Sequence, residues 1–342
     1  MGTRWEDTIR LRGSIIILDD EADSHPWNGY EGWKGIKGGI RESGELDNLT
    51  KIISVAGGKG GTGKTFVAVN LAYMLNREHK TLLVDVDVDN PCTRSFFKTR
   101  QVWEKKVLEF RPRINQDLCR LCETCVRNCP EHALVMIPGK KVILVGELCA
   151  GCGVCRLVCP FDAIEESWIE GGAIRGYETE DGIDLVVGEL QPTCRRSPVM
   201  ILKTLNAVKD LMGRYGYVVM DAPPGADAGI YSIMDYSEVT LAVTEPTPLG
   251  LMDLKKIYRL YQKFFQGRKR FMVIVNKYGL PGGSDQELRR FLDENRIAWA
   301  TIPYDDLIVR SYIAGELIVK THPNSEAANS LKEIVRLLEK EI

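Results

Sequence analysis

The chain has 342 residues, and its formal net charge of −2 and apolar fraction of 44% are those of an ordinary globular protein. The near-neutral charge offers no basic surface for nucleic acid, and no apolar run approaches the ~18–20 residues that cross a bilayer. Residues 1–12 lack the apolar stretch of a secretory signal. We therefore expect a cytoplasmic protein that binds neither nucleic acid nor a membrane.

The first 49 residues precede the first predicted strand of the main sheet and form an N-terminal extension. Residues 10–18 are compatible with a strand, and a segment rich in glycine and tryptophan follows, with Trp27 and Trp33. Exposed aromatic side chains would suit the docking of a partner. Packing of the same side chains on the chain's own core is an equal alternative, and the sequence leaves both open.

A glycine-rich loop follows residues 51–56, a short apolar run that predicts a buried parallel strand, and precedes a predicted helix at residues 66–77. Residues 58–65 fit the pattern G-x4-G-K-[ST] of a phosphate-binding loop in the context that the pattern requires. Its glycines let backbone N–H groups turn toward phosphates, and the helix N-terminus adds partial positive charge. The predicted ATP-binding residues are Gly58, Lys59, Gly60, Gly61, Thr62, Gly63, Lys64 and Thr65.

Three residues of this loop have predicted roles. Lys64 would contact the β- and γ-phosphates, and the Thr65 hydroxyl would hold Mg²⁺. An ordinary loop of this type does not specify Lys59, and the run K-G-G-T-G-K-T resembles the deviant P-loop of the MinD/Mrp/ParA superfamily of ATPases, which includes the nitrogenase iron protein. The resemblance covers roughly residues 50–342. It implies that Lys59 reaches across a nucleotide-sandwich dimer, either a homodimer or a heterodimer with a related ATPase.

Residues 81–86 predict the next buried strand, which leads into a D-x-D motif. By the same resemblance Asp87 lies near the attacking water and the metal, and acts in catalysis with Lys59 and Lys64. Asp85 would support the loop. Asp89 belongs to an Asp-Asn-Pro sequence, which favours a structural role in a turn.

Residues 216–220 predict another strand, and the D-A-P-P-G sequence that begins at Asp221 resembles the Walker B and switch II segment of the superfamily. A carboxylate at the end of a buried strand is well placed to hold Mg²⁺ through water. The expected Mg²⁺ residues are Thr65, Asp87 and Asp221.

Two later strands lead into candidate residues for the base pocket. The T-E-P-T-P sequence after residues 238–243 looks like a segment of ferredoxin-containing MinD-like proteins. Residues 271–275 lead into Asn276, for which the resemblance implies a contact with adenine. The family often has an aspartate where this chain has Gly279. Pro303 is expected to form a wall of the base pocket.

Two identical cysteine arrays, each reading C-x2-C-x2-C-x3-C-P, interrupt these motifs and contain eight of the ten cysteines. The spacing resembles bacterial-type ferredoxins that hold two [4Fe–4S] clusters. A zinc ribbon would need two C-x2-C pairs with a longer spacer, and cytosolic disulfides are rare. The ferredoxin resemblance implies one cluster on Cys119, Cys122, Cys125 and Cys159, and another on Cys149, Cys152, Cys155 and Cys129.

The two cysteines outside the arrays are Cys92, just after the D-x-D motif, and Cys194, before a predicted helix at residues 198–212. They could mark a third metal or substrate site. Two unrelated thiols are the alternative.

The expected fold is α/β, a mostly parallel twisted sheet with helices on both faces, interrupted by a small α+β ferredoxin-like insert. We expect an extension at residues 1–49, an ATPase domain from residues 50–106 and 173–342, and the insert at residues 107–172. An amphipathic helix at residues 325–342 should close the core, with Leu331 and Leu338 on its apolar face.

These features predict a nucleotide-dependent dimer that binds and hydrolyses ATP with Mg²⁺ and carries two [4Fe–4S] clusters. The leading hypothesis is assembly, delivery or reduction of an iron–sulfur or other metal centre on a client metalloprotein. One alternative is an ATP-gated electron donor to a redox partner, as the nitrogenase iron protein is. Another is a MinD/ParA-like positioning switch with structural clusters.

Overall fold

The computed structural model describes residues 50–342 except residues 193 and 284. The strand considered at residues 10–18 and the glycine- and tryptophan-rich segment after it lie outside the described residues. The strands of the main sheet are β1 (Lys51–Gly57), β2 (Thr81–Asp85), β3 (Thr99–Ile114), β6 (Ile164–Thr179), β7 (Asp184–Leu190), β8 (Tyr217–Pro224), β9 (Val239–Thr244), β10 (Arg270–Tyr278) and β11 (Ala298–Pro303).

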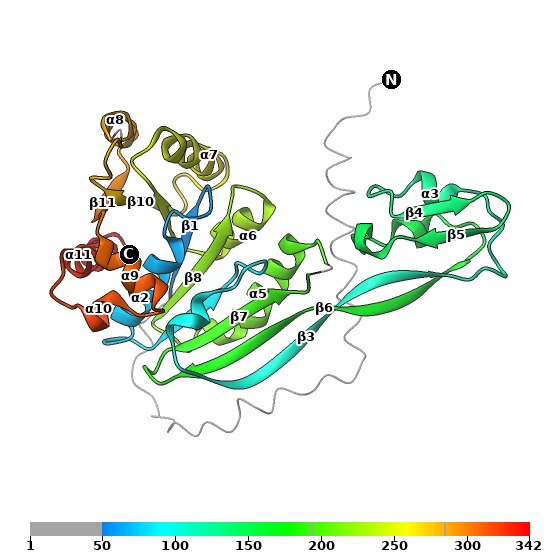
Figure 1. Cartoon of the computed structure of the whole chain (residues 1–342), viewed down its shortest axis with the longest axis horizontal. Helices are drawn as coiled ribbons and strands as arrows, with labels where there is room; N and C mark the ends of the chain where they lie inside the picture. Colours follow the sequence, from blue (N-terminus) through cyan, green and yellow to red (C-terminus); the bar gives the residue numbers. More distant parts are fainter. Residues whose placement is uncertain (1–49, 193, 284) are drawn as a thin grey trace. The chain divides into compact units, whose positions relative to one another are not determined.

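These nine strands lie in the order β11-β10-β9-β1-β8-β2-β7-β6-β3 (Figure 1). Every neighbouring pair from β11 to β7 is parallel. The β7–β6 and β6–β3 pairs are antiparallel. The expected α/β fold with a mostly parallel sheet is therefore confirmed.

Helices cover both faces of the sheet. The helices of the nucleotide-binding part are α2 (Lys64–Leu75), α5 (Ser197–Met212), α6 (Ala228–Tyr236), α7 (Pro248–Phe264), α8 (Gln286–Glu294), α9 (Asp306–Ile313), α10 (Ile318–Thr321) and α11 (Glu326–Glu341), with a 3-10 turn η3 (Thr93–Phe96). None of the helices in the described residues has the length and apolarity of a membrane span.

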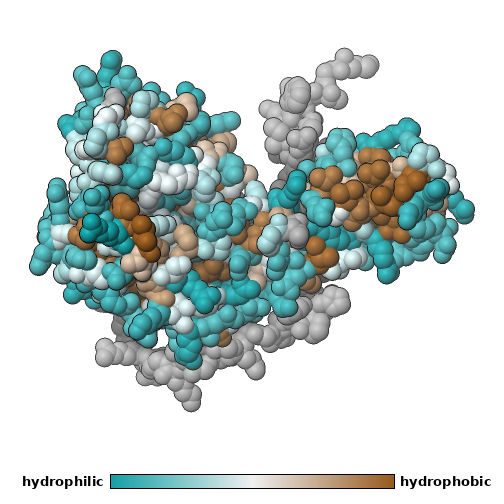
Figure 2. All heavy atoms as spheres, viewed as in Figure 1, coloured by the Kyte–Doolittle hydropathy of each residue, from teal (hydrophilic) through white to brown (hydrophobic). Residues whose placement is uncertain are grey.

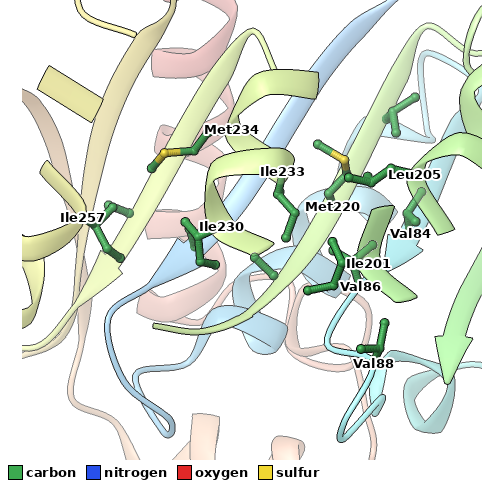
Figure 3. Packing of buried hydrophobic residues seen from close by; sticks show 14 of the residues in the cluster. Val84, Val86, Val88, Ile201, Leu205, Met220, Ile230, Ile233, Met234 and Ile257 are labelled. Atoms are coloured by element: carbon green, nitrogen blue, oxygen red, sulfur yellow. The ribbon is translucent and has the colours of Figure 1, made fainter. Parts of the chain in front are cut away.

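Each face of the sheet has its own core. On one face α5, α6, α7 and α8 pack on the strands, and Figure 3 shows Ile230 and Ile233 of α6 and Met220 of β8 in this core. On the other face α2, α10 and α11 pack on the same strands. Leu331 and Leu338 are each 1% exposed, which confirms α11 as a core helix. Its cap is Ser325, whose Oγ accepts a hydrogen bond from the Ala328 N–H at 3.1 Å.

The antiparallel edge consists of two long strands that sequence analysis did not predict. β3 and β6 have 16 residues each and pair from Thr99–Thr179 to Ile114–Ile164. Ion pairs cross between them, among them Lys106–Glu170 at 2.9 Å and Arg113–Glu165 at 2.6 Å. The expected insert boundaries at residues 107 and 172 fall inside these strands.

The insert proper is the segment 115–163 between the two strands. Its elements are α3 (Thr124–Arg127), β4 (Leu134–Ile137), β5 (Lys141–Leu144), η4 (Gly146–Leu148) and α4 (Val154–Leu157). β4 and β5 form an antiparallel hairpin with Pro138 and Gly139 in the connection between them. Apolar residues gather on its surface (Figure 2), and Leu157 is 72% exposed.

Candidate functional site

The predicted nucleotide-binding residues come together at the carboxyl ends of the parallel strands. The phosphate-binding loop follows β1, Asp85 ends β2, and Asp221 lies in β8, which separates β1 from β2. Asp85 and Asp221 are direct partners in the β2–β8 register. Open parallel sheets bind their ligands at this edge.

The loop backbone is shaped to receive an anion at the start of α2. Gly63, the residue before the helix, has φ of 95°, and no side chain caps the first N–H groups of the helix. Those N–H groups therefore remain available for phosphate oxygens. Lys64 is 7% exposed, and its Nζ donates to the Lys59 carbonyl at 3.2 Å. Burial lowers the pKa of Lys64, against the opposing charges of Asp221, Asp87 and Cys92.

Asp85 holds the loop that follows β2. Its side chain is fully buried, and its two oxygens accept the N–H groups of Asp87, Cys92 and Thr93 at 3.1, 3.0 and 3.0 Å. The Thr93 hydroxyl adds a bond of 2.8 Å. Burial raises the pKa of Asp85 to about 6 despite these donors. Asp85 thus sets the path of the chain around Asp87.

Thr65 and Asp221 form the core of the expected Mg²⁺ site. The Thr65 hydroxyl donates to Asp221 Oδ2 at 2.7 Å. Asp221 is 1% exposed, and its Oδ1 has no hydrogen-bond partner among the described residues. Burial, with the nearby Asp85 carboxylate, raises the pKa of Asp221 well above its ordinary value. A hydroxyl and a buried carboxylate with a spare oxygen are the oxygen ligands that suit Mg²⁺.

Asp87 and Cys92 both lie near Lys64, where each opposes the lowering of the Lys64 pKa by burial. Burial raises the pKa of Asp87, while the Lys64 charge lowers it. The Cys92 thiol donates to the Thr65 hydroxyl at 3.5 Å, and burial raises the pKa of this thiol. The sequence leaves Cys92 as either part of a third metal or substrate site or an unrelated thiol, and it gives no indication of the contact with Thr65. This contact depends on the turn that Asp85 imposes, so no local sequence signal could have revealed it.

Lys59 pairs with Glu245, which follows β9. Its Nζ lies 2.7 Å from Glu245 Oε2, and Lys277 contacts the other oxygen of the same carboxylate. Burial alone would raise the pKa of Glu245, but hydrogen bonds from the two lysines bring it below its ordinary value. Lys277 also donates to the Gly61 carbonyl at 3.0 Å. The lysine expected to reach a partner subunit is thus held by its own chain in this structure.

Asn276 lies beneath the phosphate-binding loop. It is 3% exposed, and its Nδ2 donates to the Thr62 carbonyl at 2.8 Å. A Cβ at Gly63 would lie 2.2 Å from this Nδ2, so the approach requires glycine. Pro303 ends β11 and is the register partner of Tyr278. Asn276 therefore braces the loop, a contact that its predicted role did not include.

The eight array cysteines line two cavities in the insert. The first pocket is lined by Cys119, Cys122, Cys125 and Cys159, and the second pocket by Cys129, Cys149, Cys152 and Cys155. These are the two sets that the ferredoxin resemblance implies, each with its fourth cysteine from the other array. Thiolates grouped around a cavity match the ligand set of a [4Fe–4S] cluster.

Backbone groups already point at two of these sulfurs. The Ala133 N–H donates to Cys129 Sγ at 3.3 Å, and the Gly151 N–H donates to Cys149 Sγ at 3.4 Å. Hydrogen bonds of this kind tune iron–sulfur sites. Within the described part of the chain, no group of three or more His, Cys, Asp or Glu side chains is already arranged to hold a metal ion.

A glycine-rich loop lies between a buried strand and a helix, and a hydroxyl at the start of that helix meets a carboxylate of the neighbouring strand β8. This arrangement defines a P-loop nucleotide-binding protein. The family model described as the CobQ/CobB/MinD/ParA nucleotide binding domain matches residues 53–318. The chain belongs to this family.

Two proteins resemble this chain over most of its length. An uncharacterized protein of Methanocaldococcus jannaschii is 27% identical over 83% of this chain and 96% of its own length. A protein of Aquifex aeolicus named iron–sulfur cluster carrier protein is 24% identical over 86% of this chain and 68% of its own length.

A solved structure shares the fold. The septum site-determining protein MinD of Pyrococcus horikoshii, solved with Mg-ADP, superposes with a TM-score of 0.50 at 20% identity. The match covers 83% of this chain and 93% of that protein.

Proposed function

We propose that this protein is a cytoplasmic iron–sulfur ATPase that dimerises on MgATP and acts on the metal centre of a client protein, by assembling, delivering or reducing it. The observation that carries the proposal is the presence, in one chain, of a P-loop site with its Mg²⁺ residues and of two four-cysteine pockets. The similarity to a protein named iron–sulfur cluster carrier supports an iron–sulfur or other metalloprotein as the client.

The nucleotide-binding residues have distinct tasks in ATP hydrolysis. The N–H groups of the loop and of the α2 N-terminus bind the phosphates, and Lys64 exchanges the Lys59 carbonyl for phosphate oxygens. Thr65 and Asp221 hold Mg²⁺, and Asp87 orients the attacking water. Asp85 keeps Asp87 in place through the N–H that it accepts.

The dimer contact uses Lys59. To reach the phosphates of a partner subunit, Lys59 has to leave Glu245. Lys277 stays on the same carboxylate, so the buried charge of Glu245 keeps a partner when Lys59 moves. This second lysine lowers the free-energy cost of releasing the first.

The insert residues hold the clusters and limit their contact with water. Bound [4Fe–4S] clusters accept and donate single electrons. Phe110, Leu134 and Leu144 line the second pocket, and Ile114, Val142 and Ile164 line the first. The two pockets adjoin through one small core that contains Cys125 and Cys155. This closeness favours electron donation as a second candidate function.

The test uses anaerobically purified protein and measures iron, sulfide and the effect on two acceptors. We expect about eight irons per chain, as two four-iron clusters require. The first acceptor is apo-aconitase, whose activity reports cluster delivery, and the second is an oxidised ferredoxin, whose absorbance reports reduction. Each is assayed with MgATP, with MgADP and with the Lys64→Ala variant.

The outcomes separate the two functions. Recovery of aconitase activity that requires MgATP supports delivery. Reduction of the ferredoxin that requires MgATP, with iron retained, supports the electron donor. A full iron content with neither effect would exclude both, and a chain that binds no iron would remove the basis of the proposal.

A further inference from the structure

The second pocket is hydrogen-bonded to the segment of the chain that leads into α5. Arg111 of β3 is 7% exposed, and one of its guanidinium nitrogens donates to the Cys149 carbonyl. The other lies 3.7 Å from Cys194 Sγ, just before α5. Arg111 therefore bridges a cysteine of the second pocket and the chain segment that leads into α5.

A second arginine acts on the same part of the pocket. Arg196, the residue before α5, donates from Nη1 to the Gly151 carbonyl at 3.2 Å. Gly151 has φ of +64°, and a Cβ there would lie 2.8 Å from the Phe110 carbonyl. The Cys149–Gly151 segment is thus pressed against β3 on one side and held by two guanidinium groups.

The start of α5 is in turn bonded to the loop that carries Asp87. The Ser197 hydroxyl donates to Asp89 Oδ1 at 2.9 Å. The N–H of Leu190, at the end of β7, donates to the Val88 carbonyl at 2.8 Å. The residues that follow the water-orienting Asp87 therefore contact the elements on both sides of the segment that contains Cys194.

The first pocket has different surroundings. Every residue that lines it lies between Ile114 and Ile164, inside the insert or at its two junctions. The chain thus places two pockets of equal ligand chemistry in unequal environments. Among the described residues, hydrogen bonds to the segment before α5 come from the second pocket and from Arg111 beside it.

We propose that Arg111 and Arg196 are positioning residues that fix the Cys149–Gly151 segment to the start of α5, so that nucleotide at the Asp87–Asp89 loop acts on the second pocket. A shift of this loop on nucleotide binding moves the Ser197 contact and, through Arg196, the Gly151 carbonyl. The proposal rests on the proposed function in one respect, since it requires a cluster in the second pocket.

Thermodynamic linkage gives the test. If nucleotide changes the reduction equilibrium of a cluster, reduction must change nucleotide affinity by the same factor, and couplings are commonly about fivefold or more. The experiment measures the Kd of a non-hydrolysable ATP analogue with Mg²⁺ for oxidised and for dithionite-reduced protein, with clusters in place. Iron content and EPR spectra are recorded on each sample.

The variants are Arg196→Gln, Arg196→Lys and Arg113→Gln. We expect the oxidised and reduced wild-type proteins to differ in Kd by about fivefold or more, and the Arg196→Gln variant to show less than about a twofold difference with unchanged iron. Arg196→Lys keeps a donor and should retain part of the effect. Arg113 lies on the same strand as Arg111 but pairs with Glu165 in solvent, so its variant should behave as wild type.

Ser197→Ala offers a second route, because it removes the Asp89 contact without touching either pocket. We expect it to reduce the difference in Kd as Arg196→Gln does. Two further variants show which pocket responds to nucleotide. Cys122→Ser alters the first pocket and should leave the nucleotide-dependent EPR change in place. Cys152→Ser alters the second pocket and should abolish that change.

Three results would overturn the proposal. They are a full Kd difference in Arg196→Gln, an equal loss in Arg113→Gln, and a nucleotide response that survives Cys152→Ser. Failure of the proposed function has a separate signature, namely the absence of iron from the wild-type protein, whereas failure of this inference leaves the iron content intact.

Discussion

The nucleotide-binding part and the insert are stabilised in different ways. The former has a large apolar core on each face of its sheet. The insert has helices of four residues, a two-stranded sheet, and a core of five buried residues, of which two are cysteines. A unit of this size rarely folds without metals or disulfides. The first region is held by its own side chains, and we expect the second to depend on the clusters that we propose its cysteines bind.

Because the two regions are stabilised differently, removal of the proposed clusters should have the largest effect, and it should act on the insert alone. Treatment with a chelator and an oxidant should abolish hydrogen-exchange protection throughout residues 115–163, because the remaining core is too small. Protection in β1, β8 and β9 should persist. Hydrogen exchange with mass spectrometry measures both regions in one sample, and equal loss in both would show that the regions are not independent.

The Lys64→Ala variant tests whether a change in the nucleotide-binding part leaves the insert unaffected. Removing this buried cation should cost about 2–5 kcal/mol of nucleotide binding, a loss of about 30-fold or more. Both clusters should remain, because no array cysteine contacts Lys64 in the described residues. Titration with a fluorescent ATP analogue and iron analysis check the two statements. The control is Lys256→Ala, which changes an exposed lysine of α7. Loss of iron in Lys64→Ala but not in this control would show that the two regions are not independent.

Asp85 predicts a pH effect confined to the nucleotide-binding part. Its pKa is raised from 3.8 to about 6, so the folded state binds more protons than the unfolded state between these values. The free energy of unfolding should therefore fall as the pH rises from about 4 to about 6, by about 3 kcal/mol from Asp85 at about 1.4 kcal/mol per pKa unit. It should continue to fall above pH 6, because the pKa of Asp221 is raised as well.

Urea unfolding with a chelator, in wild type and Asp85→Asn, measures this slope. The variant should show a smaller slope than wild type, and Asp210→Asn, an exposed residue of α5, should leave it unchanged. Added Mg²⁺ should flatten the wild-type curve, because a cation favours the ionised carboxylates. A wild-type curve that rises over this range would contradict the prediction.

The smallest effect is expected from Ser325→Ala. Loss of the cap of α11 should lower the stability of the nucleotide-binding part by about 1 kcal/mol. Thermal unfolding followed by circular dichroism measures the change, with Ser325→Asp as a variant that keeps a capping oxygen. The iron content should not change. A parallel loss of iron would show that the insert depends on the core that α11 forms with the main sheet.

The sequence predicted features whose signals are local. The strand, loop and helix around Lys64 follow from apolar runs and glycines, and the two cysteine sets follow from the resemblance to bacterial-type ferredoxins. The long β3 and β6 strands were missed because their charged residues obscure alternation, and partners such as Lys106 and Glu170 are recognised only once the register is known. The Lys59–Glu245 pair was missed for the same reason, since no local pattern joins two distant loops.

The paired strands β3 and β6 have a consequence for how such a chain could evolve. The polypeptide enters the insert at Ile114 and leaves it at Ile164, and these two residues are register partners. A short turn could replace the whole segment between them without altering any strand of the sheet. A module at the tip of a hairpin, as the proposed iron–sulfur insert is, can thus be gained, lost or exchanged without a change in the sheet that positions the nucleotide-binding residues.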